Sequence, residues 1–181
     1  MNPATANFAS TAAIAMALQA QLQQVQLPNA GGAAFQRVEL FDSENLVEAF
    51  QVLLVSEQRI AVIVPLAAHW ETECSQRKLL CRRVQPVAIL ISDRVIGTRT
   101  QALYGGVTNP GAFNLAALAV PFVAGQLINN PGGVVSVPTS ESSMILKQAD
   151  KTNLPGRAAV ALELDCKGGW IETYLNAGIT L

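Results

Sequence analysis

The only histidine of the chain is followed closely by two carboxylates. The segment is His-Trp-Glu-Thr-Glu, in which His69, Glu71 and Glu73 are potential acids, bases or metal ligands. A zinc site needs about four ligands at suitable spacing, and one histidine does not supply them. Acids at alternate positions are also typical of a strand that leaves the core and becomes polar. We therefore interpret the segment as the outer end of a strand, expect no metal and no cofactor, and regard Trp70 as a candidate contact residue.

The cysteines are Cys74, Cys81 and Cys166. Their odd number and the lack of a CxxC pair argue against a disulfide framework, so we expect reduced thiols in a cytoplasmic setting. A nucleophilic cysteine would have to use His69 as its base, which requires a tertiary contact that the sequence does not reveal. The chain has no GxSxG elbow and no Gly-rich phosphate-binding motif. The sequence therefore favours a protein that is not an enzyme.

Charged residues are few and unevenly placed. They make up 14% of the chain, and residues 1–36 and 100–140 contain none. Ordinary soluble domains carry roughly 25%. Because the centres of protein interfaces are depleted in charge, one explanation is a surface largely covered by partners. An Ala-rich composition solvated by uncharged polar residues is the other. The net charge of −1 gives no bulk attraction to nucleic acid or to anionic membranes.

One basic group stands out in this neutral chain. Its members are Arg77, Lys78, Arg82 and Arg83. The group would suit a phosphate or an acidic partner, or it is simply the solvated end of a hairpin. Glu71 and Glu73 would partly cancel its charge if the hairpin closes.

Periodicity and breakers predict the order of elements. We expect helices over residues 8–25, 43–54 and 111–127, the last capped by Asn109 and kinked at Pro121, and strands over 35–41, 60–66, 82–94, 134–137, 144–148, 158–165 and 170–175. This order predicts an α+β fold, a mostly antiparallel sheet with helices packed on one face. We expect a single domain over residues 1–181, with an N-terminal helix and linker over 1–28 and a C-terminal extension over 167–181. No membrane span or signal peptide is expected.

Four segments follow the N-terminal helix in a suggestive order: IAVIVPL running into AHWETE, RRVQPVAILISDR, a helix containing LAVPFV, and RAAVALELD. This order resembles the tail terminator (tail completion) proteins of tailed bacteriophages. The resemblance covers most of residues 4–166 and is one of pattern, without a signature motif. Residues 35–55 are longer than the family pattern, and residues 170–181 have no counterpart in it.

The resemblance implies a non-catalytic subunit that forms a ring of six and caps the head-proximal end of the tail tube. Its expected partners are copies of itself, the tail tube protein and a neck, head-completion or connector protein, with the sheath as a further candidate. DNA would pass through the lumen without specific binding. The expected location is the tail–neck junction of the virion, after assembly in the host cytoplasm.

Contacts in such a ring are expected at the hairpin of residues 70–83 and the loop of residues 105–109. The candidate interface residues are Trp70, Arg77, Lys78, Arg82, Arg83, Tyr104, Trp170, Ile171 and Tyr174. Exposed aromatic residues and arginine are enriched at interfaces. Alternative functions are another phage neck, connector or tail tube subunit, an unrelated homo-oligomer, and a small cytoplasmic enzyme or ligand-binding domain with a pocket between sheet and helices.

Overall fold

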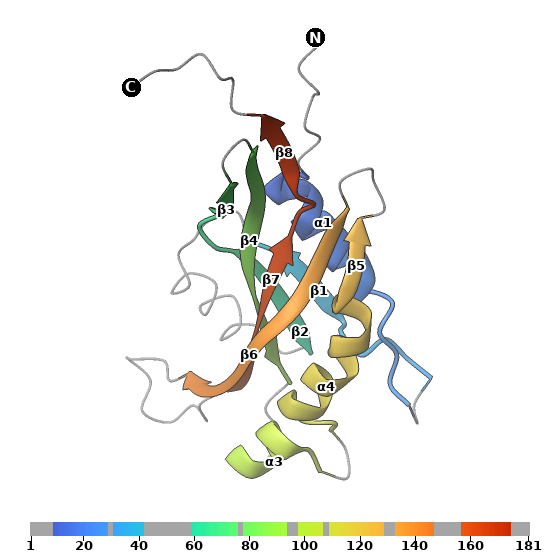
Figure 1. Cartoon of the computed structure of the whole chain (residues 1–181). Helices are drawn as coiled ribbons and strands as arrows, with labels where there is room; N and C mark the ends of the chain where they lie inside the picture. Colours follow the sequence, from blue (N-terminus) through green and yellow to red (C-terminus); the bar gives the residue numbers. More distant parts are fainter. Residues whose placement is uncertain are drawn as a thin grey trace.

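The computed structural model describes residues 9–28, 31–41, 59–75, 78–93, 98–106, 109–128, 133–146 and 157–174. These residues form three helices and one curled, eight-stranded sheet (Figure 1). The expected combination of helices and strands in one fold is therefore confirmed. The helix expected over residues 43–54 lies outside the described residues.

The helices are α1 (Thr11–Leu22), α3 (Arg99–Tyr104) and α4 (Ala112–Val123), and the strands are β1 (Arg37–Leu40), β2 (Ile60–Pro65), β3 (His69–Ser75), β4 (Lys78–Ser92), β5 (Gly125–Ile128), β6 (Val134–Leu146), β7 (Arg157–Lys167) and β8 (Ile171–Tyr174). The main path of the sheet is β1-β2-β4-β7-β6-β5, and β3 and β8 both pair with β4. Strands β1 and β2 are parallel, whereas the other described pairs are antiparallel.

Strand β4 is the central strand of the sheet and pairs with different strands along its two halves. One of its edges pairs first with β3 and then with β2, and the other edge pairs first with β8 and then with β7. Pro86 lies between the end of the β3 pairing at Val84 and the start of the β2 pairing at Val87. The backbone N–H of Leu66 donates to the Pro86 carbonyl at 2.9 Å, so this edge is occupied there by a connection. A residue without an N–H is tolerated at such a position, and β4 continues through the proline.

Both faces of the sheet are buried around the second half of β4, because successive side chains of a strand point to opposite faces. Val87, Ile89 and Ile91 belong to a large core cluster on the face that α1, α3 and α4 cover, which we call the helix-side face. Ala88 and Leu90 point to the other face, which we call the far face, and form a smaller cluster with residues such as Val62. The strand predicted over residues 60–66 is confirmed, and β2 is buried on both faces from Ile60 to Val64.

The amphipathic N-terminal helix is confirmed by α1. Ser10 caps it, its side chain accepting a hydrogen bond from the Ala13 N–H, and Ile14, Leu18 and Leu22 are buried against the sheet. No helix in the described part of the chain combines the length and the apolar character needed to cross a bilayer.

Several predicted boundaries in the neutral segment are wrong. The helix predicted over residues 111–127 ends at Val123, and residues 125–128 form β5 instead. Pro121 lies in the last turn of α4, where it does not split the helix. The two short strands predicted near residues 134–148 are one strand, β6, which curls at its end (Figure 1) and stays paired with β7 as far as Leu146. Helix α3, with a capping box formed by Thr98 and Gln101, was not predicted.

The start of α4 is held by a buried carboxylate. Asp93 accepts hydrogen bonds from the Gly111 N–H at 2.8 Å and from the Asn109 side chain at 3.1 Å. Gly111 rather than Asn109 is therefore the N-cap residue. Gly111 has φ +80° and packs so closely that an added Cβ would lie 2.1 Å from the Gly105 nitrogen. Only glycine fits at this crossing of two backbone segments.

Candidate interaction surface

Arg82 belongs to an ion-pair network at the first half of β4. Arg82 and Glu71 face each other in the β3–β4 register, and Arg82 Nε donates to Glu71 Oε2. The other oxygen of Glu71 accepts from Lys167 Nζ at 3.3 Å, and the same ammonium lies 3.9 Å from Asp165. Strands β3, β4 and β7 thus supply one network in which each cation has a carboxylate partner.

Trp170 lies over this network. The guanidinium carbon of Arg82 is 4.5 Å from the centroid of the Trp170 ring. The guanidinium is therefore held between a carboxylate and an aromatic face, an arrangement that the planar guanidinium of arginine favours. Trp170 remains 41% exposed, so part of its ring is available to a partner.

Strand register brings two exposed valines to the same face. Val135 is paired with Lys167 and Val137 with Asp165, and paired residues of antiparallel strands share a face. Val135 is 46% exposed and Val137 is 42% exposed. We call the far-face patch formed by Glu71, Arg82, Val135, Val137, Asp165, Lys167 and Trp170 the Trp170 surface.

The two carboxylates and the two cations of the Trp170 surface neutralise one another. The hydrogen bond from Arg82 is the main cause that lowers the pKa of Glu71 below its usual value, and Lys167 acts in the same direction. Glu71 is therefore ionised at neutral pH and keeps both cations in place. Nearby on β4, Lys78 forms a 2.7 Å ion pair with Glu172 of β8. The arrangement offers exposed apolar groups among paired charges, which is the composition of a protein-binding surface rather than of an anion site.

His69 and the three thiols lie on opposite faces of the sheet. His69 is paired with Val84. Cys74 lies five residues from His69 on β3, and Cys81 lies three residues from Val84 on β4. Cys166 is paired with Gln85, the residue next to Val84. The alternation of side chains therefore separates His69 from each cysteine by the sheet itself. The Cys–His pair that the sequence left open is not formed. Among the described residues, no three potential ligands converge on a metal position.

Arg83 points to the helix-side face and holds the start of α1. Its guanidinium donates to the carbonyl of Ala9 at 3.1 Å, to the Thr11 hydroxyl at 2.6 Å and to the Gln85 carbonyl oxygen at 2.7 Å. Gln85 is buried and is also bonded to Thr11 and, through its amide nitrogen, to the carbonyls of Leu66 and Pro86. Arg83 is therefore half-buried and fixes α1 on the sheet.

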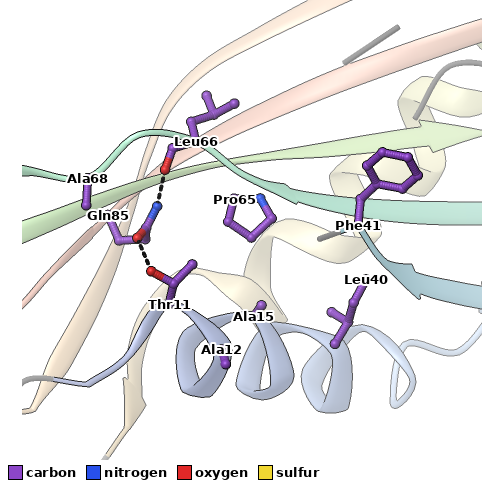
Figure 2. Close-up of a pocket in the computed structure, with 9 residues that line it drawn as sticks. All are labelled: Thr11, Ala12, Ala15, Leu40, Phe41, Pro65, Leu66, Ala68 and Gln85. Atoms are coloured by element: carbon purple, nitrogen blue, oxygen red, sulfur yellow. Dashed lines mark hydrogen bonds between the residues drawn. The ribbon is translucent and has the colours of Figure 1, made fainter. Parts of the chain in front are cut away.

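A pocket lies beside this network, between α1 and the ends of β1 and β2 (Figure 2). Its volume is about 440 Å³, and the described residues that line it are Thr11, Ala12, Ala15, Leu40, Phe41, Pro65, Leu66, Ala68 and Gln85. None of these lining residues is ionisable. The only side-chain amide, Gln85, already uses its polar atoms in hydrogen bonds, two of which are drawn in Figure 2. The pocket can therefore hold an apolar group, but its described lining offers no acid, base or nucleophile.

The remaining predicted interface residues are dispersed. Tyr104 ends α3 at the bottom of Figure 1, far from β3 and β8 at the top, and is 65% exposed with its ring 5.3 Å from that of Phe113. Trp70 is 51% exposed and points to the helix-side face, as its pairing with Arg83 requires. Ile171 is half-buried on β8 opposite Cys81. Arg77 and the Tyr174 side chain lie outside the described parts of the structure, as does part of the loop of residues 105–109.

The structure thus brings Arg82 and Trp170 together, places Lys78 four residues from Arg82 on the same strand, and separates them from Tyr104 and Trp70. Sequence reasoning missed Lys167, Val135 and Val137. Glu71 and Lys167 are 96 residues apart in the sequence, so no short-range pattern predicts their contact. At the start of β6, Val135 and Val137 alternate with the buried Val134 and Ser136. A strand prediction therefore places the two valines on one face, but their residue type does not indicate that this face is exposed. Comparisons of the chain with known protein families and with curated proteins find no match.

Proposed function

We propose that this protein is a structural subunit of the tail terminator type, which forms a ring that caps the tail tube and docks it to the neck or head. The observation that carries the proposal is the Trp170 surface, an exposed tryptophan and two exposed valines set in a network of paired charges. A ring subunit gives up surface to neighbours on both flanks and on its axial faces, and such surface is poor in unpaired charge.

The order of elements supports the same proposal. A leading helix, a mostly antiparallel sheet with helices on one face, a long central strand and a helix with an internal proline follow the pattern of the resemblance. In this proposal the ring of six covers the open end of the tube and so stops its growth. Its axial faces then bind the tube protein on one side and the neck or connector protein on the other.

The proposed role is non-catalytic and involves no cofactor. Two observations support this part of the proposal. His69 is separated from each thiol by the sheet, and the described lining of the pocket has no ionisable group. DNA would pass through the lumen without sequence-specific contact, since the cations of the Trp170 surface are engaged by carboxylates.

Native mass spectrometry combined with negative-stain imaging of the purified protein tests the proposal. We expect a closed ring with six times the chain mass of 19.2 kDa. Open filaments of increasing length would identify a tube subunit instead. A monomer at every accessible concentration, with no rings in the images, would contradict the proposal.

A second candidate function, binding of a small apolar molecule, is favoured by the pocket beside α1. Its volume of about 440 Å³ is within the range of small-molecule sites. The fluorescent probe Nile red tests this candidate with the variant Ala12→Trp, because Ala12 lines the pocket and is exposed. Saturable binding by the wild type that Ala12→Trp abolishes would support it, and binding that is unchanged in this variant would exclude the pocket.

A further inference from the structure

The outer surface of α1 and α4 is free of charged side chains. Both helices lie in segments, residues 1–36 and 100–140, that contain no Lys, Arg, Asp or Glu. The exposed residues include Met16 and Ala20 on α1 and Ala117, Pro121 and Phe122 on α4. Met16 is 60% exposed and Phe122 is 38% exposed. We call these five residues the α1–α4 surface.

The α1–α4 surface and the Trp170 surface lie on opposite sides of the sheet. The helices cover the helix-side face, whereas Arg82, Lys167 and the exposed valines point to the far face. A closed ring is built from two different surfaces on opposite flanks of each subunit, because each neighbour is related to the next by the same rotation. Two unlike surfaces in these positions are what a head-to-tail contact requires.

We propose that the α1–α4 surface of one copy binds the Trp170 surface of the next copy. This proposal rests on the ring function proposed above and names the surfaces that form its subunit contact. In the contact, the exposed part of the Trp170 ring is buried against the uncharged helices, and Val135 and Val137 extend the apolar area.

The charges of the two surfaces are compatible with this contact. The α1–α4 surface brings no ion, and on the Trp170 surface Arg82 and Lys167 keep Glu71 as their partner. No buried charge is therefore left without its partner when water is excluded, so the large penalty for an unpaired buried ion is avoided. Two Trp170 surfaces facing each other would instead bring like charges together and leave the helices uncovered.

A mixing experiment with two charge variants tests the proposal. One variant carries Met16→Glu and Ala117→Glu, which places carboxylates on the α1–α4 surface. The other carries Trp170→Glu and Val135→Glu, which places them on the Trp170 surface. Each variant alone is expected to be monomeric. In a one-to-one mixture, the intact Trp170 surface of the first variant can bind the intact α1–α4 surface of the second. Every other contact in the mixture involves a mutated surface. The mixture is therefore expected to give a dimer of twice the chain mass of 19.2 kDa and nothing larger.

A matched control is Ser142→Glu, which adds the same charge at an exposed position of β6 outside both surfaces. This variant is expected to form the wild-type ring. Circular dichroism establishes that each variant is folded. Should a charge variant unfold, a photo-cross-linking amino acid in place of Phe122 gives the same answer, with cross-links expected to the peptide that contains Trp170 or Val135.

The outcomes separate this proposal from the ring function. Wild-type rings whose charge variants stay assembled, or whose mixture stays monomeric, would overturn the proposed contact and leave the ring intact. Cross-links from position 122 to α1 or α4 of another copy would do the same. A wild-type protein that forms no ring would remove the ring function, and the proposed contact with it.

Discussion

Arg82 lies beneath the ring of Trp170, with 4.5 Å between the guanidinium carbon and the ring centroid. The same guanidinium is bonded to Glu71 on the neighbouring strand. Trp170 follows β7 and precedes β8, so this contact fixes a large apolar side chain that would otherwise rotate at a strand connection. A fixed aromatic side chain loses less entropy on binding, which is how an anchor residue gains affinity.

Replacement of Arg82 by Gln should release Trp170. A cation–π contact at an exposed site contributes about 0.5–1 kcal/mol, so the ring should become more mobile without global unfolding. We expect stronger acrylamide quenching of Trp170 fluorescence, measured in a Trp70→Phe background so that one tryptophan reports. Arg37→Gln is the matched control, because Arg37 pairs with Glu39 on β1. Equal quenching in the Arg82 variant and its parent would contradict the role of this contact.

Glu71 should make the protein more stable at neutral pH than in acid. Its pKa is lowered in the folded state, chiefly by the Arg82 hydrogen bond, so folding favours the ionised form. This contribution is complete above the ordinary glutamate pKa of 4.5 and is lost as the pH falls through the lowered pKa of the folded state. Urea unfolding between pH 7 and pH 3 should show a shallower acid dependence for Glu71→Gln. The exposed Glu73→Gln on the same strand serves as control, and identical acid dependence in Glu71→Gln and wild type would refute the assignment.

Gly111→Ala should destabilise the fold severely. An added Cβ would meet the Gly105 nitrogen at 2.1 Å in a backbone with φ +80°, and the Asp93 hydrogen bond to this N–H would be disturbed. Combined strain and displacement should cost more than about 3 kcal/mol in the free energy of unfolding. Gly31→Ala is the control, since Gly31 has φ +62° with nothing within 4 Å. It should cost only about 1–2 kcal/mol, the intrinsic penalty of a left-handed backbone; similar losses for both would argue against the close approach.

Gln85→Leu should loosen α1 from the sheet. Thr11 and Arg83 both donate to the Gln85 oxygen, and the carbonyls of Leu66 and Pro86 accept from its nitrogen. Leaving such buried partners unsatisfied should lower the free energy of unfolding by about 2–4 kcal/mol. Hydrogen exchange should accelerate in α1 before it does so in β7. Gln24→Leu, at an exposed position where the side chain bonds only to Ala20, should have little effect. Unchanged exchange in α1 would show that the network does not hold the helix.

The cysteines should react in an order set by their exposure. Burial, with the nearby Asp165 charge, raises the pKa of Cys166 to about 12, so its thiol stays protonated at neutral pH. The thiolate is the reactive form, and Cys74 is exposed. Iodoacetamide followed by peptide mass mapping should modify Cys74 first and Cys166 only after unfolding. Rapid native alkylation of Cys166 would contradict the packing of β7 against the helices.

The sequence predicted the strands and the first helix better than the segment around α4. Continuous apolar and β-branched runs specify β2 and the inner parts of β4 and β7, because strands buried on both faces are apolar throughout. Residues 126–128 continue the apolar composition of α4, so the one local sign of the change from helix to strand is Gly125, which has φ +106°. The change depends on pairing with β6, where Gly125 faces Ser136. Pairing over such distances is decided by the tertiary fold rather than by propensity.

The candidate surface was only partly predictable for the same reason. Trp170 and Arg82 were identified as exposed interface types, but their contact joins segments 88 positions apart in the printed sequence. Arg83 was assigned to the same basic group, although alternation along β4 turns it to the opposite face. The strand register, and not the type of residue, shows that Arg82 and Arg83 point to opposite faces of the sheet.

Strand β4 is 15 residues long, about 50 Å at the usual rise per residue. Its second half contributes buried side chains to both core clusters, whereas its first half carries Arg82 and pairs with β3 and β8. The two halves have different neighbours, so mutations in the first half, apart from Arg83, Val84 and Gln85, can accumulate without repacking the interior. During evolution, the binding partners of this protein can therefore change while its fold is retained.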